Sequence, residues 1–218
     1  IVAVKNVSHS VDGIQVLNNV SFSIENGDKV AITGSSSVSK TTLLQVLSGE
    51  ITPDEGEIKW GETITPTYFP KDNGSFFETT DNLIEWLKQF DEELDLQSLR
   101  GYLGRMLFSG DDALKSVNVL SGGEKARAMF ARLMLLEGNA ILFDEPTDHL
   151  DLEAISALND GLIQFPEVLM FTSHDFEILR TVPNRIIEVS PNGYVDYSGS
   201  FDDFINHDVY QKKVAAIQ

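Results

Sequence analysis

The sequence has no cysteine in its 218 residues, which excludes disulfide bonds and thiolate metal sites. It also lacks any apolar run near the roughly 18 residues of a membrane-spanning helix, and no signal-peptide pattern opens it. We therefore expect a cytoplasmic protein without a membrane span. The first residue is Ile1 instead of methionine, so we expect a fragment of a longer chain.

Positive charge is scarce in this sequence. Lys and Arg number 16 against 34 Asp and Glu, which gives a formal net charge of −18. Such a surface repels phosphate backbones, which disfavours non-specific binding of DNA or RNA by this segment. The acidic residues are spread along the chain, so we interpret them as a solubility feature. Hydrophobic residues make up 42%, which is ordinary for one globular domain of this length.

Apolar runs predict strands towards both ends of the chain. β-branched residues are frequent in 1–11 and 16–24, and shorter apolar runs follow at 30–33, 140–143 and 168–172. Runs of the shorter kind are typical of strands buried on both faces of a parallel sheet. The chain therefore predicts an α/β core with additional strands in its N-terminal third.

The middle of the chain, roughly 72–135, has the apolar spacing of helices. Leu83 and Leu87 recur at that spacing, and Thr80 or Asp81 is the expected cap of their helix. We therefore expect a helical subdomain between the strand-rich parts.

A small-residue segment, Gly34–Thr41, follows the apolar run 30–33 and precedes a helical pattern. This order suits a loop that wraps backbone N–H groups around a phosphate and points a helix N-terminus at it. Lys40 would contact the β and γ phosphates, and the Thr41 hydroxyl would bind Mg²⁺. The strict motif has glycine where Ser39 stands, so a Ser-rich turn that only caps a helix stays open.

Two carboxylates, Asp144 and Glu145, come directly after the apolar run 140–143. Ligands of open α/β sheets bind at the carboxyl ends of the strands. Asp144 would hold Mg²⁺ there, and Glu145 would orient or deprotonate the attacking water. An acidic turn without chemistry is the simpler reading, but two acids after a buried strand favour function.

Leu120–Glu124 and His174 extend this pattern. Ser121 with Glu124 forms a capping box, which predicts a helix start. Gly122 and Gly123 are unfavourable in a first helical turn, unless a γ-phosphate approaches the backbone there. His174 follows the run 168–172 and would reach the same sheet edge as Glu145.

Together these segments resemble the ATP-binding cassette (ABC) family, with Leu120–Glu124 as signature, Ile141–Glu145 as Walker B, His174 as switch histidine and Asp151 in the D-loop. The resemblance covers essentially the whole chain. It implies a P-loop NTPase core with a parallel sheet and flanking helices, an antiparallel β subdomain and an α-helical subdomain, in a single domain over 1–218. It also implies ATP and Mg²⁺ as cofactors, ATP hydrolysis with Glu145 and His174 as catalytic residues, and Thr41 and Asp144 as metal ligands. The nucleotide-contacting positions are Gly34, Ser35, Ser36, Ser37, Val38, Ser39, Lys40, Thr41, Thr42, Lys71, Val11, Ser121, Gly122 and Gly123.

The stretch Asp144–Asp151 is similar to the ABC-F subgroup, whose usual phrase has Asn where Asp148 stands. The segments Tyr68–Asp72 and Tyr197–Phe201 also resemble that subgroup. ABC-F chains carry two ATPase domains without transmembrane parts, and they act on the ribosome. The resemblance therefore implies a C-terminal domain whose partners are a second ABC domain, arranged head to tail, and the ribosome.

Several positions depart from the family pattern. Family members have glycine where Ser37 and Ser39 stand, and usually Asn where Ser36 stands. Lys71 replaces the Q-loop glutamine, and Val11 stands where an aromatic ring stacks on adenine. If the serines need positive φ, the strain costs about 1–2 kcal/mol each, and lost stacking about 0.5–1.5 kcal/mol more. We therefore expect weakened ATP binding.

The sequence leaves two alternative functions open. The first is the ATPase subunit of a membrane transporter, which would need a groove for coupling helices beside Lys71, and the short Lys71 region and the phrase His149–Asp151 argue against it. The chain would instead be a weakly binding, non-hydrolysing scaffold domain if the serine-substituted loop cannot hold phosphate.

Overall fold

The computed structural model describes all of residues 1–218, and its strands form two sheets. The smaller sheet is antiparallel, with the order β2 (Ile14–Ile24), β1 (Val2–Val11), β4 (Glu55–Trp60). The larger sheet has the order β5 (Pro66–Phe69), β6 (Ala140–Asp144), β7 (Val168–Thr172), β3 (Lys29–Thr33), β8 (Arg185–Ser190), β9 (Gly193–Ser198). Its strands are parallel except for β9, which pairs antiparallel with β8. The predicted α/β core with an antiparallel N-terminal sheet is confirmed.

Alternate residues of the central strands pack into two separate cores, one on each face of the larger sheet. Leu142 and Met170 belong to the core that includes α1 and the strands of the smaller sheet. Phe143 and Phe171 belong to the core that includes the helices of the middle segment. Every residue of β7 is buried, as predicted for a strand covered on both faces.

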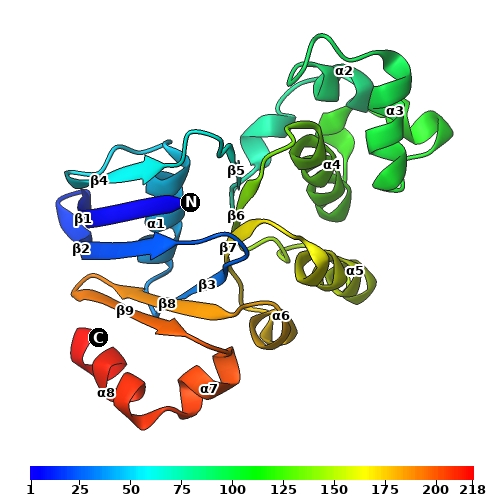
Figure 1. Cartoon of the computed structure of the whole chain (residues 1–218). Coiled ribbons are helices and arrows are strands. Elements are labelled where there is room, and N and C mark those ends of the chain that lie inside the picture. The colour runs from blue at the N-terminus through cyan, green and yellow to red at the C-terminus, as the bar shows by residue number, and fades with distance from the viewer.

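Helices cover both faces of the larger sheet (Figure 1). Other helices form a separate cluster at one side of the molecule (Figure 1). In that cluster, α2, α3 and α4 lie within the segment 72–135 and project away from the smaller sheet (Figure 1). The helix bounds are α1 Ser37–Ser48, α2 Leu83–Lys88, α3 Leu96–Arg105, α4 Gly122–Leu135, α5 Leu152–Gln164, α6 Phe176–Thr181, α7 Phe201–Asn206 and α8 Asp208–Ile217, with short 3₁₀ turns at Gly74–Phe77, Gly110–Leu114 and Val117–Val119. None of these helices has the length and apolar character that crossing a membrane requires.

The cap of α2 differs from the expected one. Asn82, and neither Thr80 nor Asp81, occupies the N-cap, where its side chain accepts from the N–H groups of Ile84 and Glu85. The Glu85 carboxylate returns a contact to the N–H of Asn82 at 3.1 Å. This reciprocal pair satisfies more of the free N–H groups than a cap placed earlier would.

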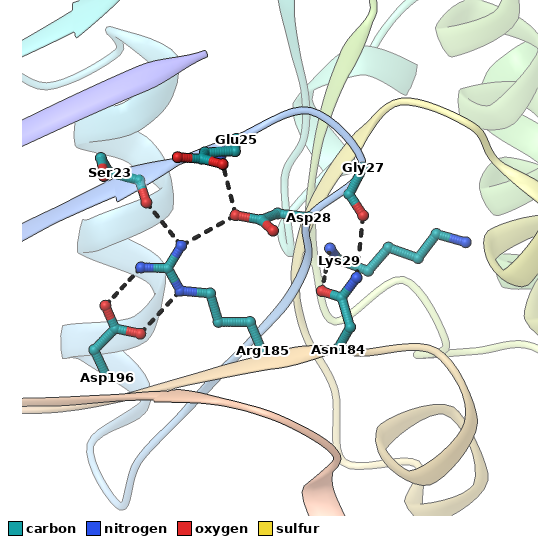
Figure 2. Close-up of polar contacts among 8 residues, drawn as sticks. All are labelled: Ser23, Glu25, Gly27, Asp28, Lys29, Asn184, Arg185 and Asp196. Carbon is teal, nitrogen blue, oxygen red and sulfur yellow. Dashed lines mark hydrogen bonds and ion pairs between the residues drawn. The ribbon is translucent and has the colours of Figure 1, made fainter.

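Arg185 ties the two sheets together (Figure 2). Its guanidinium donates to Asp196 on β9 at 2.6 Å, to Asp28 before β3 at 3.0 Å and to the Ser23 carbonyl on β2 at 2.7 Å. The neighbouring Asn184 accepts from the Lys29 N–H at 2.9 Å (Figure 2). These contacts anchor the start of β3, the strand that leads into the segment Gly34–Thr41.

Candidate functional site

Strands β3, β6 and β7 are parallel members of one sheet, so their carboxyl ends share one edge. The segments that follow these strands are Gly34–Ser36, Glu145–Asp151 and Ser173–Asp175. They are far apart in the sequence and carry most of the predicted site residues. The sheet order puts β7 between β3 and β6, so the end of β7 lies between the other two segments.

The phosphate loop, Gly34–Thr41, contains an early helix start. Ser36 is the N-cap of α1, and its Oγ accepts from the Ser39 N–H at 3.1 Å and from the Ser39 hydroxyl at 2.9 Å. None of Ser36, Ser37 and Ser39 has positive φ, so the strain considered for these serines is not realised here. The helix begins at Ser37, which gives Ser37 and Ser39 helical angles that any residue adopts, and the N-cap Ser36 is extended.

Gly34 keeps the one special conformation of the loop. Its φ is 142°, and a Cβ there would collide with the backbone carbonyl of Val189 on β8. The loop therefore leaves β3 pressed against the neighbouring strand, and only glycine fits this position. Beyond it, the N–H groups of Ser37 and Val38 have no partner within the helix, as in any first helical turn.

Lys40 is 7% exposed and lies near two buried carboxylates, Glu145 and Glu188. Burial raises the pKa of Glu188, while a hydrogen bond from the Thr33 hydroxyl and the charge of Lys40 lower it. The Lys40 charge also opposes the upward shift of the Glu145 pKa. Lys40 is therefore the positive centre of this edge.

Asp144 ends β6 and is 1% exposed. Its carboxylate accepts from the Thr41 hydroxyl at 2.7 Å and from the Thr172 hydroxyl at 2.8 Å. The Tyr68 hydroxyl lies 3.5 Å away, and burial together with the Asp144 charge raises the pKa of Tyr68, so this hydroxyl stays protonated. Two neighbouring strands, β5 and β7, and the helix α1 thus contribute hydroxyl groups around Asp144.

Thr41 and Asp144 fit a magnesium site. Mg²⁺ prefers oxygen ligands and is commonly held by one or two protein groups together with substrate phosphates. The Thr41 hydroxyl and the Asp144 carboxylate, 2.7 Å apart, are such a pair. The structure has no cluster of three or more His, Cys, Asp or Glu that could bind a metal alone, so phosphate oxygens would have to complete this site.

Glu145 and His174 contact each other at the sheet edge that the sequence predicted for both. Glu145 has φ of 49°, a left-handed conformation that is uncommon for this residue type. Its carboxylate accepts from the His174 N–H at 2.9 Å and lies 3.2 Å from His174 Nε2. Burial raises the pKa of Glu145, and the charges of His174 and Lys40 counteract this shift. A buried carboxylate with an elevated pKa can accept a proton from water.

The start of α4 carries the predicted capping box. Ser121 accepts from the Glu124 N–H at 3.2 Å, and Glu124 accepts from the Ser121 N–H at 2.8 Å. A Cβ on Gly122 would lie 3.1 Å from the Cβ of His149, so this glycine allows close packing against the segment after β6. Ser121 and Gly122 are exposed.

Lys71 lies after β5 in a polar pocket of about 270 Å³. The same pocket is lined by Glu145, Gly122, Lys125 and His149. The structure therefore groups the signature glycine with Lys71 and Glu145, and it groups the phosphate loop with Asp144. A larger apolar groove of about 610 Å³ lies between α4 and α5 and does not include Lys71.

The remaining predicted positions lie at the margins of this edge. Val11 is the last residue of β1, in the smaller sheet, and packs against the core that contains α1. Thr42 is 2% exposed, so its side chain is part of the α1 packing.

Sequence reasoning missed three buried polar side chains of this edge, namely Tyr68, Thr172 and Glu188. Thr172 lies inside the apolar run 168–172 that was interpreted as a strand, whereas Tyr68 was noted only as part of the segment Tyr68–Asp72. A single polar residue near the carboxyl end of a buried strand was the available signal, because such groups need a partner. The sequence does not say which partner.

The comparisons with known proteins identify the family of this chain. Residues 17–148 match the family described as ABC transporter. The ABC transporter ATP-binding protein YkpA of Bacillus subtilis is 48% identical over 219 residues, covering 100% of this chain and 41% of that relative. ABC transporter F family member 2 of Arabidopsis thaliana is 32% identical over 210 residues, covering 96% of this chain and 31% of that relative.

A translation-related protein is also similar. The energy-dependent translational throttle protein EttA of Haemophilus influenzae is 34% identical over 212 residues, covering 94% of this chain and 37% of that relative. The chain therefore spans less than half the length of the curated relatives compared here.

The fold matches a solved cassette. The dimeric post-hydrolysis structure of the ATP-binding cassette MJ0796, bound to ADP and Pi, superposes with a TM-score of 0.76 at 21% identity, covering 91% of this chain and 98% of that one. The architecture is thus that of an ABC ATPase. With the family match extending over more than half of its length, the chain belongs to the ABC transporter family, as an ATP-binding domain of the class that hydrolyses ATP.

Proposed function

We propose that this domain binds Mg-ATP at the edge formed by β3, β6 and β7, and hydrolyses it when closed head to tail on a second ABC domain of an ABC-F protein. The observation that carries this proposal is the contact between three distant segments. Thr41 meets Asp144 at 2.7 Å, and Glu145 meets His174 at 3.2 Å. The two candidate metal ligands, Thr41 and Asp144, and the candidate general base, Glu145, therefore lie beside the same phosphate-binding loop.

The proposed residue roles follow from this geometry. Lys40 neutralises charge on the β and γ phosphates, and Thr41 and Asp144 hold Mg²⁺, which would neutralise further phosphate charge. Glu145 orients the attacking water and takes its proton as the water oxygen bonds to the γ phosphorus and the bond to ADP breaks. His174 fixes the Glu145 carboxylate through two contacts.

The signature segment acts, in this proposal, on the nucleotide of the partner domain. Ser121 and Gly122 are exposed at the start of α4, where the helix N-terminus favours an anion. In this domain Gly122 lines the Lys71 pocket, and no residue of the phosphate loop lines that pocket. A cassette of the same fold has been solved as a dimer.

The ABC-F assignment and the ribosome as partner rest on resemblance. The phrase Asp144–Asp151 matches that subgroup at all but Asp148, and relatives include an F family member and a translational throttle protein. We propose that residues 1–218 form one ATPase domain, with a helical subdomain near 72–135, in a longer two-domain cytoplasmic protein. The domain's closing and opening would then be coupled to the ribosome.

The experiment that tests this proposal uses the full-length protein. Ser121→Ala should lower steady-state ATP turnover without changing ATP binding by this domain, because the signature would contact the other domain's nucleotide. Ser98→Ala, in the first turn of α3, is the matched control. Unchanged turnover in Ser121→Ala would refute the head-to-tail role.

Ribosome association is measured separately by co-sedimentation with purified ribosomes. Glu145→Gln should increase the sedimenting fraction in ATP relative to ADP, because the closed state persists without hydrolysis. Equal sedimentation in ATP and ADP, for wild type and variant, contradicts the ribosome coupling.

A scaffold role is the second candidate, and the capped phosphate loop favours it. Ser36 already occupies the Ser39 N–H, a group that would otherwise face an anion. Calorimetric titration with Mg-ATP should compare the natural chain with a Ser37→Gly, Ser39→Gly variant. Binding only by the glycine variant would favour a non-hydrolysing scaffold, whereas binding by both favours the ATPase.

The lining of the pocket beside Lys71 does not favour the transporter alternative. A coupling helix lays an apolar face into an apolar groove, and the pocket beside Lys71 is small and lined mainly by charged and polar groups.

A further inference from the structure

Thr172 is a buried hydroxyl at the centre of the site edge. It is the last residue of β7 and has no exposed surface. In the β6–β7 pairing it stands opposite Asp144, the last pair of the ladder. The strand order puts β7 between the phosphate-loop strand β3 and the carboxylate strand β6.

The Thr172 hydroxyl makes two hydrogen bonds in opposite directions. It donates to Asp144 Oδ1 at 2.8 Å and accepts from the Glu145 N–H at 2.9 Å. A hydroxyl has one hydrogen to donate, so its donation to Asp144 requires that Asp144 offers an acceptor oxygen there. One side chain thus links the carboxylate proposed for the metal to the backbone of the proposed general base.

The second bond lies where the regular strand pairing has ended. Glu145 follows the last paired residue of β6 and turns into the left-handed region, with φ of 49°. Its N–H is buried, and a buried N–H without a partner is rare because desolvation is unfavourable. Thr172 Oγ1 supplies this partner, so it supports the turn that points Glu145 at His174.

The rest of the Thr172 side chain fixes where this hydroxyl lies. Threonine is β-branched, which restricts χ1, and its position in a fully buried strand leaves no room to rotate. The other Asp144 oxygen, Oδ2, faces Thr41 at 2.7 Å and Tyr68 at 3.5 Å. Thr172 therefore orients the carboxylate so that one oxygen remains directed at Thr41.

We propose that Thr172 is a positioning residue for ATP hydrolysis, which holds the Asp144 carboxylate toward the metal and Glu145 toward the attacking water. This inference rests on the Mg-ATP function proposed above for the same edge. It predicts that Thr172 affects the magnesium-dependent steps and not the contacts of Gly34–Thr41 with phosphate.

The test compares Thr172→Val, Thr172→Ser and Glu145→Gln with wild type in the full-length protein. Valine has nearly the same shape and lacks the hydroxyl, whereas serine keeps it. Outer partners of metal ligands typically change affinity or activity by about 10–100-fold. Thr172→Val should lower kcat by about that factor and raise the Mg²⁺ concentration needed for half-maximal activity, and Thr172→Ser should stay near wild type. ATP binding in the presence of EDTA should be equal in all three Thr172 forms.

The outcomes separate this inference from the proposed function. If Thr172→Val hydrolyses ATP like wild type while Glu145→Gln is impaired, the positioning role is wrong. If Glu145→Gln is also unimpaired, the proposed function of the edge is wrong and the inference falls with it. If thermal melting shows that Thr172→Val does not fold, Thr172→Ala replaces it. Equal kcat and Mg²⁺ dependence in the alanine and serine variants would then overturn the proposal.

Discussion

The phosphate loop and the carboxylate edge belong to the same sheet and complete their hydrogen bonds in different ways. In the loop, Ser36 caps the helix that follows it and occupies the Ser39 N–H and hydroxyl. At the carboxylate edge, Asp144 and Glu145 are held by groups from elsewhere in the chain, namely the hydroxyls of Thr41 and Thr172 and the backbone N–H of His174.

The difference indicates which region must change when ligand binds. The loop satisfies itself locally, so an anion has to compete with Ser36 for the Ser39 N–H. The carboxylate edge is already oriented, and preorganised groups need little rearrangement during a reaction. We therefore expect loop variants to change ATP affinity and carboxylate-edge variants to change turnover.

The largest expected effect is on turnover at the carboxylate edge. Glu145→Gln removes the proposed proton acceptor, so kcat should fall by about 10²–10⁴-fold, with ATP affinity nearly unchanged. Single-turnover hydrolysis and equilibrium binding of a fluorescent ATP analogue measure the two quantities. Retained kcat would show that Glu145 is not the base.

Lys40→Ala should, in contrast to Glu145→Gln, mainly weaken ATP binding. Removing a buried charge that donates to phosphate costs about 1.5–3 kcal/mol, which corresponds to about 10–150-fold weaker ATP binding. Equilibrium titration with ATP measures this loss, and exposed Lys88→Ala is the control. Similar affinities of wild type and Lys40→Ala would remove the loop from the binding site.

Ser36→Ala tests the self-capping of the loop. Loss of an N-cap destabilises a protein by about 1 kcal/mol, so the nucleotide-free domain should unfold more easily. Because the anion no longer competes with the Ser36 hydroxyl, ATP should bind about fivefold more tightly. Ser48→Ala, at the other end of α1, is the control, and weaker ATP binding by Ser36→Ala would contradict this account of the loop.

The smallest effect concerns stability as a function of pH. Burial raises the folded-state pKa of Glu145 above its ordinary value of 4.5, so the folded protein prefers the protonated form. The protonated Glu145 therefore contributes to the free energy of unfolding. This contribution is fully present below pH 4.5 and is lost as the pH rises through the folded-state pKa of Glu145. The ionised Glu145 therefore destabilises the fold at neutral pH.

Glu145→Gln should accordingly melt at a higher temperature than wild type at neutral pH, with a difference that shrinks in acid. The lost attraction to His174 is small, because that side chain is 69% exposed and exposed pairs contribute little. Thermal melting across a pH series, with exposed Glu92→Gln as control, measures the difference. A lower melting temperature of Glu145→Gln than of wild type at neutral pH would contradict the predicted direction of this stability change.

Local patterns in the sequence were sufficient for much of the fold. The buried run Val168–Thr172 and the capping box of Ser121 with Glu124 are found as predicted. The cap of α2 was predicted too early, because Thr80, Asp81 and Asn82 are all capping residue types. Only the reciprocal contact with Glu85 selects Asn82.

The site was predicted in part. The proximity of Glu145 and His174 follows from a rule about strand ends, and the structure has them in contact. Thr172 and Glu188 were missed because a polar residue within an apolar run has no local pattern that names its partner. The sequence could not show whether Ser37 and Ser39 adopt a strained backbone conformation with positive φ. Their φ angles depend on where α1 begins.

The sequence by itself determined where strand-rich and helical segments lie, because these follow from periodicity, and its short motifs indicated the family and the residue types available for phosphate, metal and proton transfer. The tertiary structure alone decided that Thr172 joins Asp144 to Glu145 and that Ser36 closes the loop on itself. The physical reason is that a buried polar group must find its partner in space, and the strand order of the sheet sets which groups come within hydrogen-bond distance.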